Sequence, residues 1–131
     1  MKNDYGGPER RRFRRVRADF TLIYRIDRPI EVRIMIGSRD IDSVMLDLSE
    51  GGMSILTDYN IPVSTVLIIK FTLINMKAEK ERRTRVMSII GEVRYNRSLE
   101  GMGRRLGICF IEIDEADRSA IVDFVKMIAS S

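Results

Sequence analysis

Apolar and polar residues alternate along much of the chain, at the period of two that is typical of half-buried β-strands. Three successive segments show this pattern before residue 49. Their apolar faces are formed by Phe20, Leu22, Tyr24 and Ile26, then by Ile30, Val32, Ile34 and Ile36, and then by Val44, Leu46 and Leu48. Turn-forming residues separate the segments, at 27–29 and at 37–40. The pattern therefore predicts three strands in this part of the chain.

Four more strand-like segments follow, at residues 53–56, 63–74, 84–95 and 106–113. The charged loop 77–83 joins two long β-branched segments, which is typical of a hairpin, and a second loop at 96–103 precedes the last segment. Six or seven strands with short connections and no helical pattern between them indicate an antiparallel sheet. Closing that sheet into a small barrel would remove its exposed edges.

The period changes near the C-terminus, where Ile121, Val122, Val125 and Ile128 recur at helical spacing. Asp114 is a suitable N-cap, with Asp117 three residues later. We expect an amphipathic helix over about 115–129 that packs on the barrel without a chemical role of its own. No internal repeat or linker interrupts the chain, so we expect a flexible tail over 1–9 and one domain over 10–131.

Composition excludes most catalytic chemistry. The 131 residues include no histidine, which is the commonest proton shuttle and metal ligand, and one cysteine, which cannot form an internal disulfide or a thiolate-rich zinc site. The exposed carboxylates Glu79, Glu81, Glu112 and Glu115 show no pattern of a nucleophile and its base. We expect no catalytic residue, no metal site, no cofactor and no enzymatic activity.

Cellular location is constrained by two further observations. Cys109 lies in the apolar stretch 107–113, where it is best interpreted as a small core residue of a protein in a reducing compartment. No apolar stretch approaches the roughly 20 residues of a membrane helix, and residues 1–8 lack the apolar centre of a signal peptide. We expect a cytoplasmic protein without membrane insertion.

Positive charge is concentrated at the N-terminus. Residues 1–17 contain seven basic and two acidic residues, whereas the remainder contains sixteen and seventeen. Six arginines lie between Arg10 and Arg17, interrupted by Phe13 and Val16. The forked guanidinium suits phosphate oxygens or the O6 and N7 edge of guanine better than lysine does. The arm 10–17 therefore predicts a phosphorylated or nucleotide ligand, although a solvated basic tail would have the same composition.

A second candidate binding element lies in the turn Asp47-Leu48-Ser49-Glu50-Gly51-Gly52. A carboxylate at Asp47 can accept from guanine N1 and N2, and the hydroxyl of Ser49 can donate to phosphate or brace the turn. Gly51 and Gly52 would allow a positive φ and a close backbone approach. Taken alone, these residues also suit an ordinary tight turn.

Together the two elements resemble the PilZ domain, the bacterial receptor module for cyclic di-GMP. Its R-x-x-x-R motif is similar to Arg11 and Arg15, and its [D/N]-x-S-x-x-G motif is similar to residues 47–52. Arg10 and Arg14 also stand four apart, but the first strand follows Arg15 directly, which favours Arg11 and Arg15. The resemblance continues through 91–93, 106–110 and the closing helix, and it implies a six-stranded antiparallel β-barrel with a C-terminal α-helix.

The resemblance implies a ligand site and a relay. Cyclic di-GMP would be bound by Arg10, Arg11 and Arg15 from the arm and by Asp47, Ser49 and Gly52 on the barrel. The arginine-rich arm would be disordered without ligand and would order on binding, which would change the surface presented to a downstream protein. Phe13 would anchor the docked arm or stack on a base. Arg10 directly before the first motif makes an intercalated ligand dimer plausible beside a single bound molecule.

Two other functions remain open from the sequence. A small β-barrel with a basic arm is also suited to nucleic acid, but several aromatic residues outside the arm fall on core-facing positions rather than on a basic groove. We therefore expect no specific nucleic-acid partner. A PilZ-like structural adaptor that binds no ligand is the other alternative. The sequence names neither the downstream process nor the oligomeric state.

Overall fold

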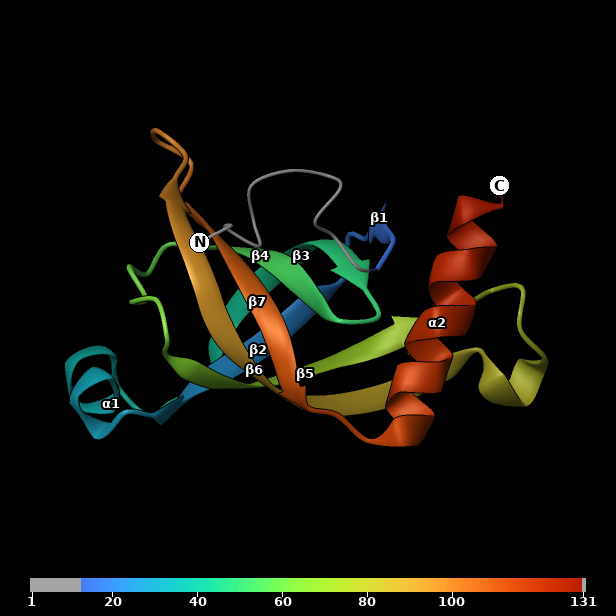
Figure 1. Ribbon diagram of the computed structural model, residues 1–131, viewed down its shortest axis with the longest axis horizontal. Helices are drawn as coiled ribbons and strands as arrows, with labels where there is room; N and C mark the ends of the chain where they lie inside the picture. Colours follow the sequence, from blue (N-terminus) through green and yellow to red (C-terminus); the bar gives the residue numbers. More distant parts are fainter. Residues whose placement is uncertain (1–12, 131) are drawn as a thin grey trace, which may run out of the picture.

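Seven strands and two α-helices are found in residues 13–130, the part of the chain that the computed structural model describes (Figure 1). In chain order the elements are β1 (Arg15–Arg17), β2 (Thr21–Arg28), α1 (Ile30–Ile36), β3 (Ile41–Ser49), β4 (Gly52–Thr57), β5 (Val66–Ile74), the short 3-10 helix η2 (Lys80–Arg82), β6 (Thr84–Ser98), β7 (Arg104–Glu112) and α2 (Glu115–Ala129). Arg10, Arg11 and Arg12 of the predicted arm, together with the expected tail over 1–9, lie outside the described residues.

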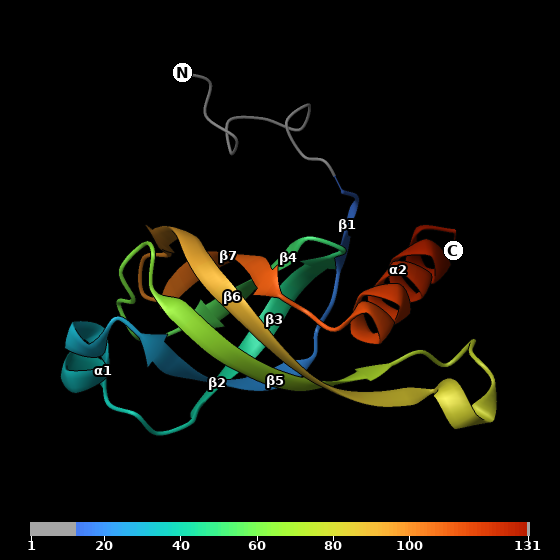
Figure 2. The same ribbon diagram turned by 60° about the horizontal axis from the view of Figure 1, so that its bottom comes forward.

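The strands form a closed antiparallel barrel (Figure 2). Neighbouring strands pair in the order β3-β2-β5-β6-β7-β4, and pairing between β4 and β3 closes the ring. β1 adds a seventh strand that pairs with the end of β3, beyond the part of β3 that pairs with β2. Closure leaves each barrel strand with a partner on both sides. The predicted six-stranded antiparallel β-barrel with a C-terminal helix is confirmed.

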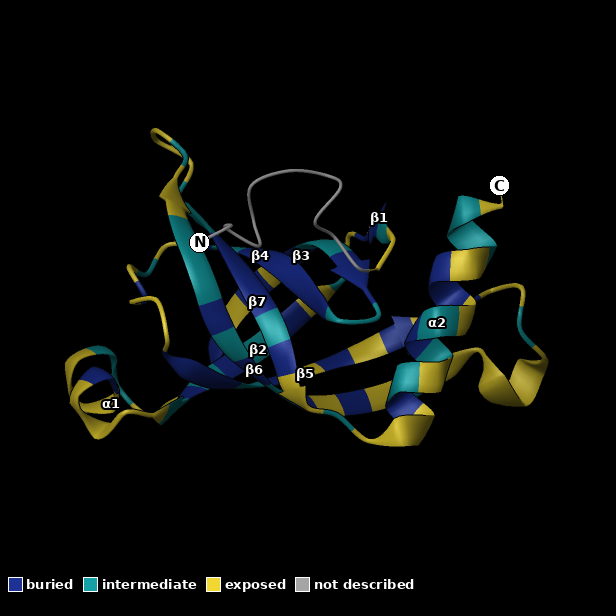
Figure 3. Cartoon of the chain, in the orientation of Figure 1, coloured by how far each residue is buried: buried dark blue, intermediate teal, exposed yellow. Residues whose placement is uncertain are grey.

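Side chains from every barrel strand fill the interior, in the alternation of buried and exposed positions that Figure 3 shows along the ribbons. The largest fully buried side chains include Tyr24, Met45, Met53, Leu67, Ile89 and Leu106. Tyr24 brings a hydroxyl into this core, and that hydroxyl lies 2.7 Å from the Oγ1 of Thr57. The polar end of the tyrosine is therefore satisfied inside the barrel.

The strand predicted over 30–36 is wrong, because these residues form the helix α1. Their amides bond locally: Val32 and Arg33 donate to the carbonyl of Pro29, and Gly37 donates to the carbonyl of Arg33. Both edges of β2 are already occupied, by β3 and by β5, so no sheet edge is free for another strand here. Alternation every second residue also places pairs at i and i+4, which a helix brings onto one face.

The inward face predicted for the segment before residue 49 is wrong at two positions. Met45 points into the core, whereas Val44 is exposed and Leu46 is half-buried. The pairing of β3 with β4 shifts by one residue between Met45 and Asp47, so Leu48 returns to the interior. Such a β-bulge re-aims the side chains that follow it. Here it places Asp47 on the outer surface of the barrel.

Helix α2 occupies the predicted residues and packs beside the barrel against β3 and β1, close to Arg85 of β6 (Figure 1). Ile121, Phe124 and Val125 are buried, and the ring of Phe124 lies 5.4 Å from that of Phe20, measured between centroids. Asp114 occupies the N-cap position, but its side chain makes no capping hydrogen bond. Asp117 is turned toward the strands, where its carboxylate accepts a hydrogen bond of 2.6 Å from Arg85 Nε.

Candidate functional site

Strand β1 brings an arginine of the basic arm onto the outer face of β3. Val16 is buried opposite Leu48, so the residues on either side of it, Arg15 and Arg17, point outward. The Nη1 atom of Arg15 lies 2.8 Å from the Oδ1 atom of Asp47. The two motifs that the sequence singled out therefore meet in the structure, through a charge-assisted hydrogen bond. The expectation of a disordered arm does not hold for Arg15–Arg17, which form β1.

A second arginine, Arg105 on β7, binds the other oxygen of the same carboxylate. Its Nη2 atom lies 2.8 Å from Asp47 Oδ2, and the backbone N–H of Ser54 donates to Oδ1 at 3.1 Å. Asp47 is mostly covered, with 16% of its side chain exposed, while the two arginines keep 25% and 33% exposed. The carboxylate is thus fixed on the barrel by three donors, and both guanidinium groups retain access to solvent.

Tyr95 on β6 completes this surface. Its hydroxyl accepts a hydrogen bond of 3.3 Å from Arg105 Nε, and the guanidinium of Arg97 lies 5.5 Å from the centre of its ring. The ring covers Gly107, where a Cβ atom would come within 1.9 Å of it. Burial lowers the pKa of Arg105, but the hydrogen bond to Tyr95 and the charge of Asp47 outweigh burial, and the net pKa is raised above its ordinary value.

The turn between β3 and β4 is braced by Ser49. Its Oγ accepts from the N–H groups of Gly51 at 3.3 Å and Gly52 at 3.2 Å, and it donates to the carbonyl of Gly52 at 3.2 Å. Of the two roles predicted for this hydroxyl, the structure places it in the bracing one. The serine is buried, and these three hydrogen bonds hold the shape of the turn.

The two glycines of the turn allow close packing rather than unusual backbone angles. The expected positive φ is wrong for both, because neither is among the glycines with positive φ in the described residues. A Cβ on Gly52 would come within 2.1 Å of the carbonyl oxygen of Ile108, and a Cβ on Gly51 would lie 2.6 Å from the ring of Phe13. Phe13 therefore rests on the turn, which is the anchoring position of its two predicted roles.

The family follows from comparison with known sequences. The profile of the PilZ domain matches residues 9–127. The chain belongs to the PilZ domain family. No curated protein sequence matches it significantly.

Three solved structures share the fold. The PilZ domain of YcgR from Escherichia coli, solved with c-di-GMP, aligns with a TM-score of 0.60 at 14% identity over 92% of each chain. The inhibitor of motility MotI (DgrA) from Bacillus subtilis aligns with a TM-score of 0.69 at 16% identity, and MrkH, a c-di-GMP-dependent transcription regulatory factor, with 0.58 at 12%. The alignments with MotI and MrkH cover 89% and 92% of this chain, respectively. This chain spans about half the length of each of the two proteins, 50% of MotI and 52% of MrkH.

In this PilZ domain, the predicted site residues fall into two groups. Arg15, Asp47, Ser49 and Gly52 lie together on the outer face of β1, β3 and β4. Arg10 and Arg11 lie outside the described residues. Of the two candidate registers of the arginine motif, Arg15 is the member that contacts Asp47, whereas Arg14 is exposed beside the cleft between the turn and α2.

Arg105 and Tyr95 were not predicted from the sequence. The strand register places Tyr95 opposite Gly107 and Arg105 opposite Leu56. Tyr95 and Arg105 therefore join the face that carries Asp47 only when the barrel closes. A signal was present in the alternation of Arg105, Gly107 and Cys109 around the buried Leu106 and Ile108. The described residues contain no cluster of possible metal ligands and no helix long and apolar enough to cross a membrane.

Proposed function

We propose that this protein binds cyclic di-GMP on the outer face formed by β1, β3, β4 and β7. The observation that carries the proposal is the sharing of Asp47 between Arg15 and Arg105. Cyclic di-GMP presents two phosphates and two guanines. Arginine forks suit both groups, while a carboxylate suits the N1 and N2 donors of guanine. Membership of the PilZ family supports this choice of ligand.

Each predicted residue has a role in this proposal. Arg15, with Arg10 and Arg11 upstream, binds phosphate or the O6 and N7 edge of guanine, and Asp47 orients the arginines or accepts from the base. Because Arg105 also neutralises Asp47, Arg15 can turn toward the ligand without leaving the carboxylate unpaired. Ser49 and Gly52 maintain the turn that the ligand approaches.

The relay to a downstream protein begins at the arm. Arg15–Arg17 are already paired with β3, and Phe13 already contacts the turn at Gly51. We therefore expect the ligand to act on the arginines at and before Arg15, and to fix them against the barrel. A protein that recognises the arm and the turn together would then distinguish the bound state from the free state.

Calorimetric titration with cyclic di-GMP tests the proposal, with GMP as the control ligand and RNA as the competitor. Each bidentate contact between arginine and guanine contributes about 1 to 3 kcal/mol, so we expect Arg15→Ala to weaken binding about tenfold or more. Arg82→Ala, an exposed change in η2, is the matched control and should bind as the wild type does. The fitted stoichiometry reports whether one ligand molecule or two are bound.

Two results would count against the receptor function. Absence of heat with the wild type would favour an adaptor that binds no ligand, and equal affinity for RNA at physiological salt would favour nucleic-acid binding. An unchanged affinity of Arg15→Ala would leave the ligand in place but would move the site away from β1 and β3.

A further inference from the structure

Helix α1 lies at one end of the barrel (Figure 2). Several of its apolar side chains are exposed to solvent. Of its seven residues only Val32 is buried, whereas Ile30, Ile34 and Met35 are exposed, Ile34 at 79%. The segment 29–40 joins two neighbouring antiparallel strands, a connection for which two to five residues are common. A shorter connection would therefore be enough to join the two strands. Most of the residues that the insertion adds are exposed to solvent.

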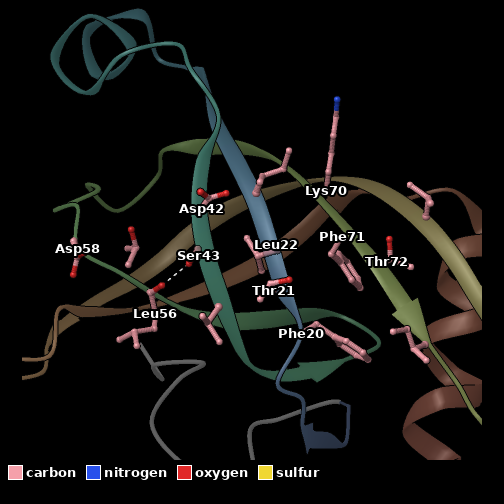
Figure 4. Close-up of a pocket in the computed structure, with 15 residues that line it drawn as sticks. Phe20, Thr21, Leu22, Asp42, Ser43, Leu56, Asp58, Lys70, Phe71 and Thr72 are labelled. Carbon is pink, nitrogen blue, oxygen red and sulfur yellow. Dashed lines mark hydrogen bonds between the residues drawn. The ribbon is translucent and has the colours of Figure 1, made fainter.

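A groove of about 790 Å³ crosses the outer faces of β2, β3 and β5 (Figure 4). One end of it has an apolar floor formed by Ile23, Val44 and Leu56, and Figure 4 shows Asp42 and Asp58 at that end. Both carboxylates are exposed, and neither has an ion-pair partner within residues 13–130. The groove thus combines an apolar floor with two unpaired carboxylates, and the exposed Lys70 stands on the other side of Ile23 from Asp42.

The exposed face of α1 matches this end of the groove in both respects. Its apolar side chains suit the floor. The helix also carries two exposed charges with no ion-pair partner among the described residues: Arg33 suits the two aspartates, and Glu31 suits Lys70. The helix cannot reach the groove of its own chain. It begins one residue after β2 and is separated from β3 by four residues, so both of its ends are held at the rim of the barrel.

We propose that α1 of one chain docks in the β2–β3–β5 groove of a second copy, and that the second copy returns the same contact. A reciprocal contact of this kind closes into a two-fold dimer. Ile30, Ile34 and Met35 of each chain lie on Val44 and Ile23 of the other, and Arg33 pairs with Asp42 and Asp58. The contact uses no residue of the cyclic di-GMP site, and it goes beyond the proposed function.

The mass of the purified full chain, measured by sedimentation velocity over a wide concentration range without any nucleotide, tests the dimer. We expect a reversible dimer that Ile34→Glu and Val44→Glu each weaken at least about tenfold, because a charge would face an apolar surface. Met102→Glu, which changes an exposed methionine in the β6–β7 turn, should leave the dimer unchanged. Thermal unfolding of each variant controls for folding.

Mixing charge variants tests the pairing between two chains. Arg33→Glu alone and Asp42→Arg alone should each weaken the homodimer, because each places like charges in both contacts. An equimolar mixture should form a heterodimer in preference to either homodimer, since one of its contacts is native and the other has its charges exchanged. Absence of that heterodimer, a monomer at every concentration, or growth beyond a dimer would overturn the proposal. Because no cyclic di-GMP is present, none of these results bears on the ligand site.

Discussion

Tyr24 shows how a single polar group is accommodated inside the barrel. Its side chain is fully buried, and its hydroxyl pairs with Thr57. Burial raises the pKa of this phenol from the ordinary 10.0 to about 12, because the phenolate would lose its hydration. In the unfolded chain the phenol ionises at a pH about two units lower than in the folded protein. Between pH 10 and about pH 12 the unfolded state therefore binds fewer protons than the folded state.

The free energy of unfolding should therefore fall as the pH rises from about 10 to about 12. The ionisation of Tyr24 accounts for about 3 kcal/mol of this fall at most. We expect Tyr24→Phe to be less stable than the wild type at neutral pH by about 1 kcal/mol, because the hydrogen bond to Thr57 is lost. Above pH 10 its stability should decline less steeply. Urea unfolding of both proteins at several alkaline pH values measures the difference. Parallel alkaline declines would contradict this role of Tyr24.

Arg105 offers a second test at the residue scale, because it entered the site only through the structure. We expect Arg105→Ala to weaken cyclic di-GMP binding several-fold, since Asp47 would then hold Arg15 alone and release it less readily. Calorimetry on this variant, with Arg82→Ala as the exposed control, gives the ratio. Equal affinities in both variants would show that Arg105 takes no part in binding the ligand.

At the scale of elements, a partly buried ion pair supplements the apolar packing of α2 on the barrel. Arg85 on β6 donates to Asp117, which is mostly covered at the start of the helix. Removing the arginine leaves a poorly hydrated carboxylate beneath the helix, a loss that exceeds the net value of the pair itself. The cost of losing Arg85 therefore depends on whether the carboxylate of Asp117 is still present.

We expect Arg85→Met, which keeps the apolar stem of the side chain, to lower the free energy of unfolding by about 2 kcal/mol. The double variant Arg85→Met/Asp117→Asn should recover part of that loss. Hydrogen exchange of the α2 amides, read beside urea unfolding, locates the change. A double variant less stable than Arg85→Met would show that the asparagine, and not the missing partner, determines the result.

The elements that the sequence predicted correctly are those with a strong local signal. The hairpin of β5 and β6 follows from two β-branched segments around a charged loop, and α2 follows from its helical spacing. Two predictions failed because they depended on pairing. Residues 30–36 have the alternation of a strand but no free sheet edge, and the bulge after Met45 reverses the face of β3 without any mark in the local pattern.

At the scale of the whole molecule, the candidate site is assembled across the closed barrel. The resemblance of the arginine arm and of the turn at 47–52 to the two PilZ motifs was enough to predict that Arg15 and Asp47 belong together. The partner on the other side, Arg105, is 58 residues from Asp47 in the chain, and only closure of β4 against β7 brings it there. Local patterns carry no information on that pairing, which explains why half of the charged site was predictable and half was not.

Cyclic di-GMP binding at this face is tested most directly by NMR spectroscopy of the 15N-labelled full chain during titration with the nucleotide. We predict that the largest shifts fall on Arg15–Arg17, on the turn from Asp47 to Gly52 and on Arg105, while the amides of α1 and of the β5–β6 loop do not move. Shifts that are absent at saturating nucleotide, or that gather in the groove of β2, β3 and β5 instead, would contradict the proposed site.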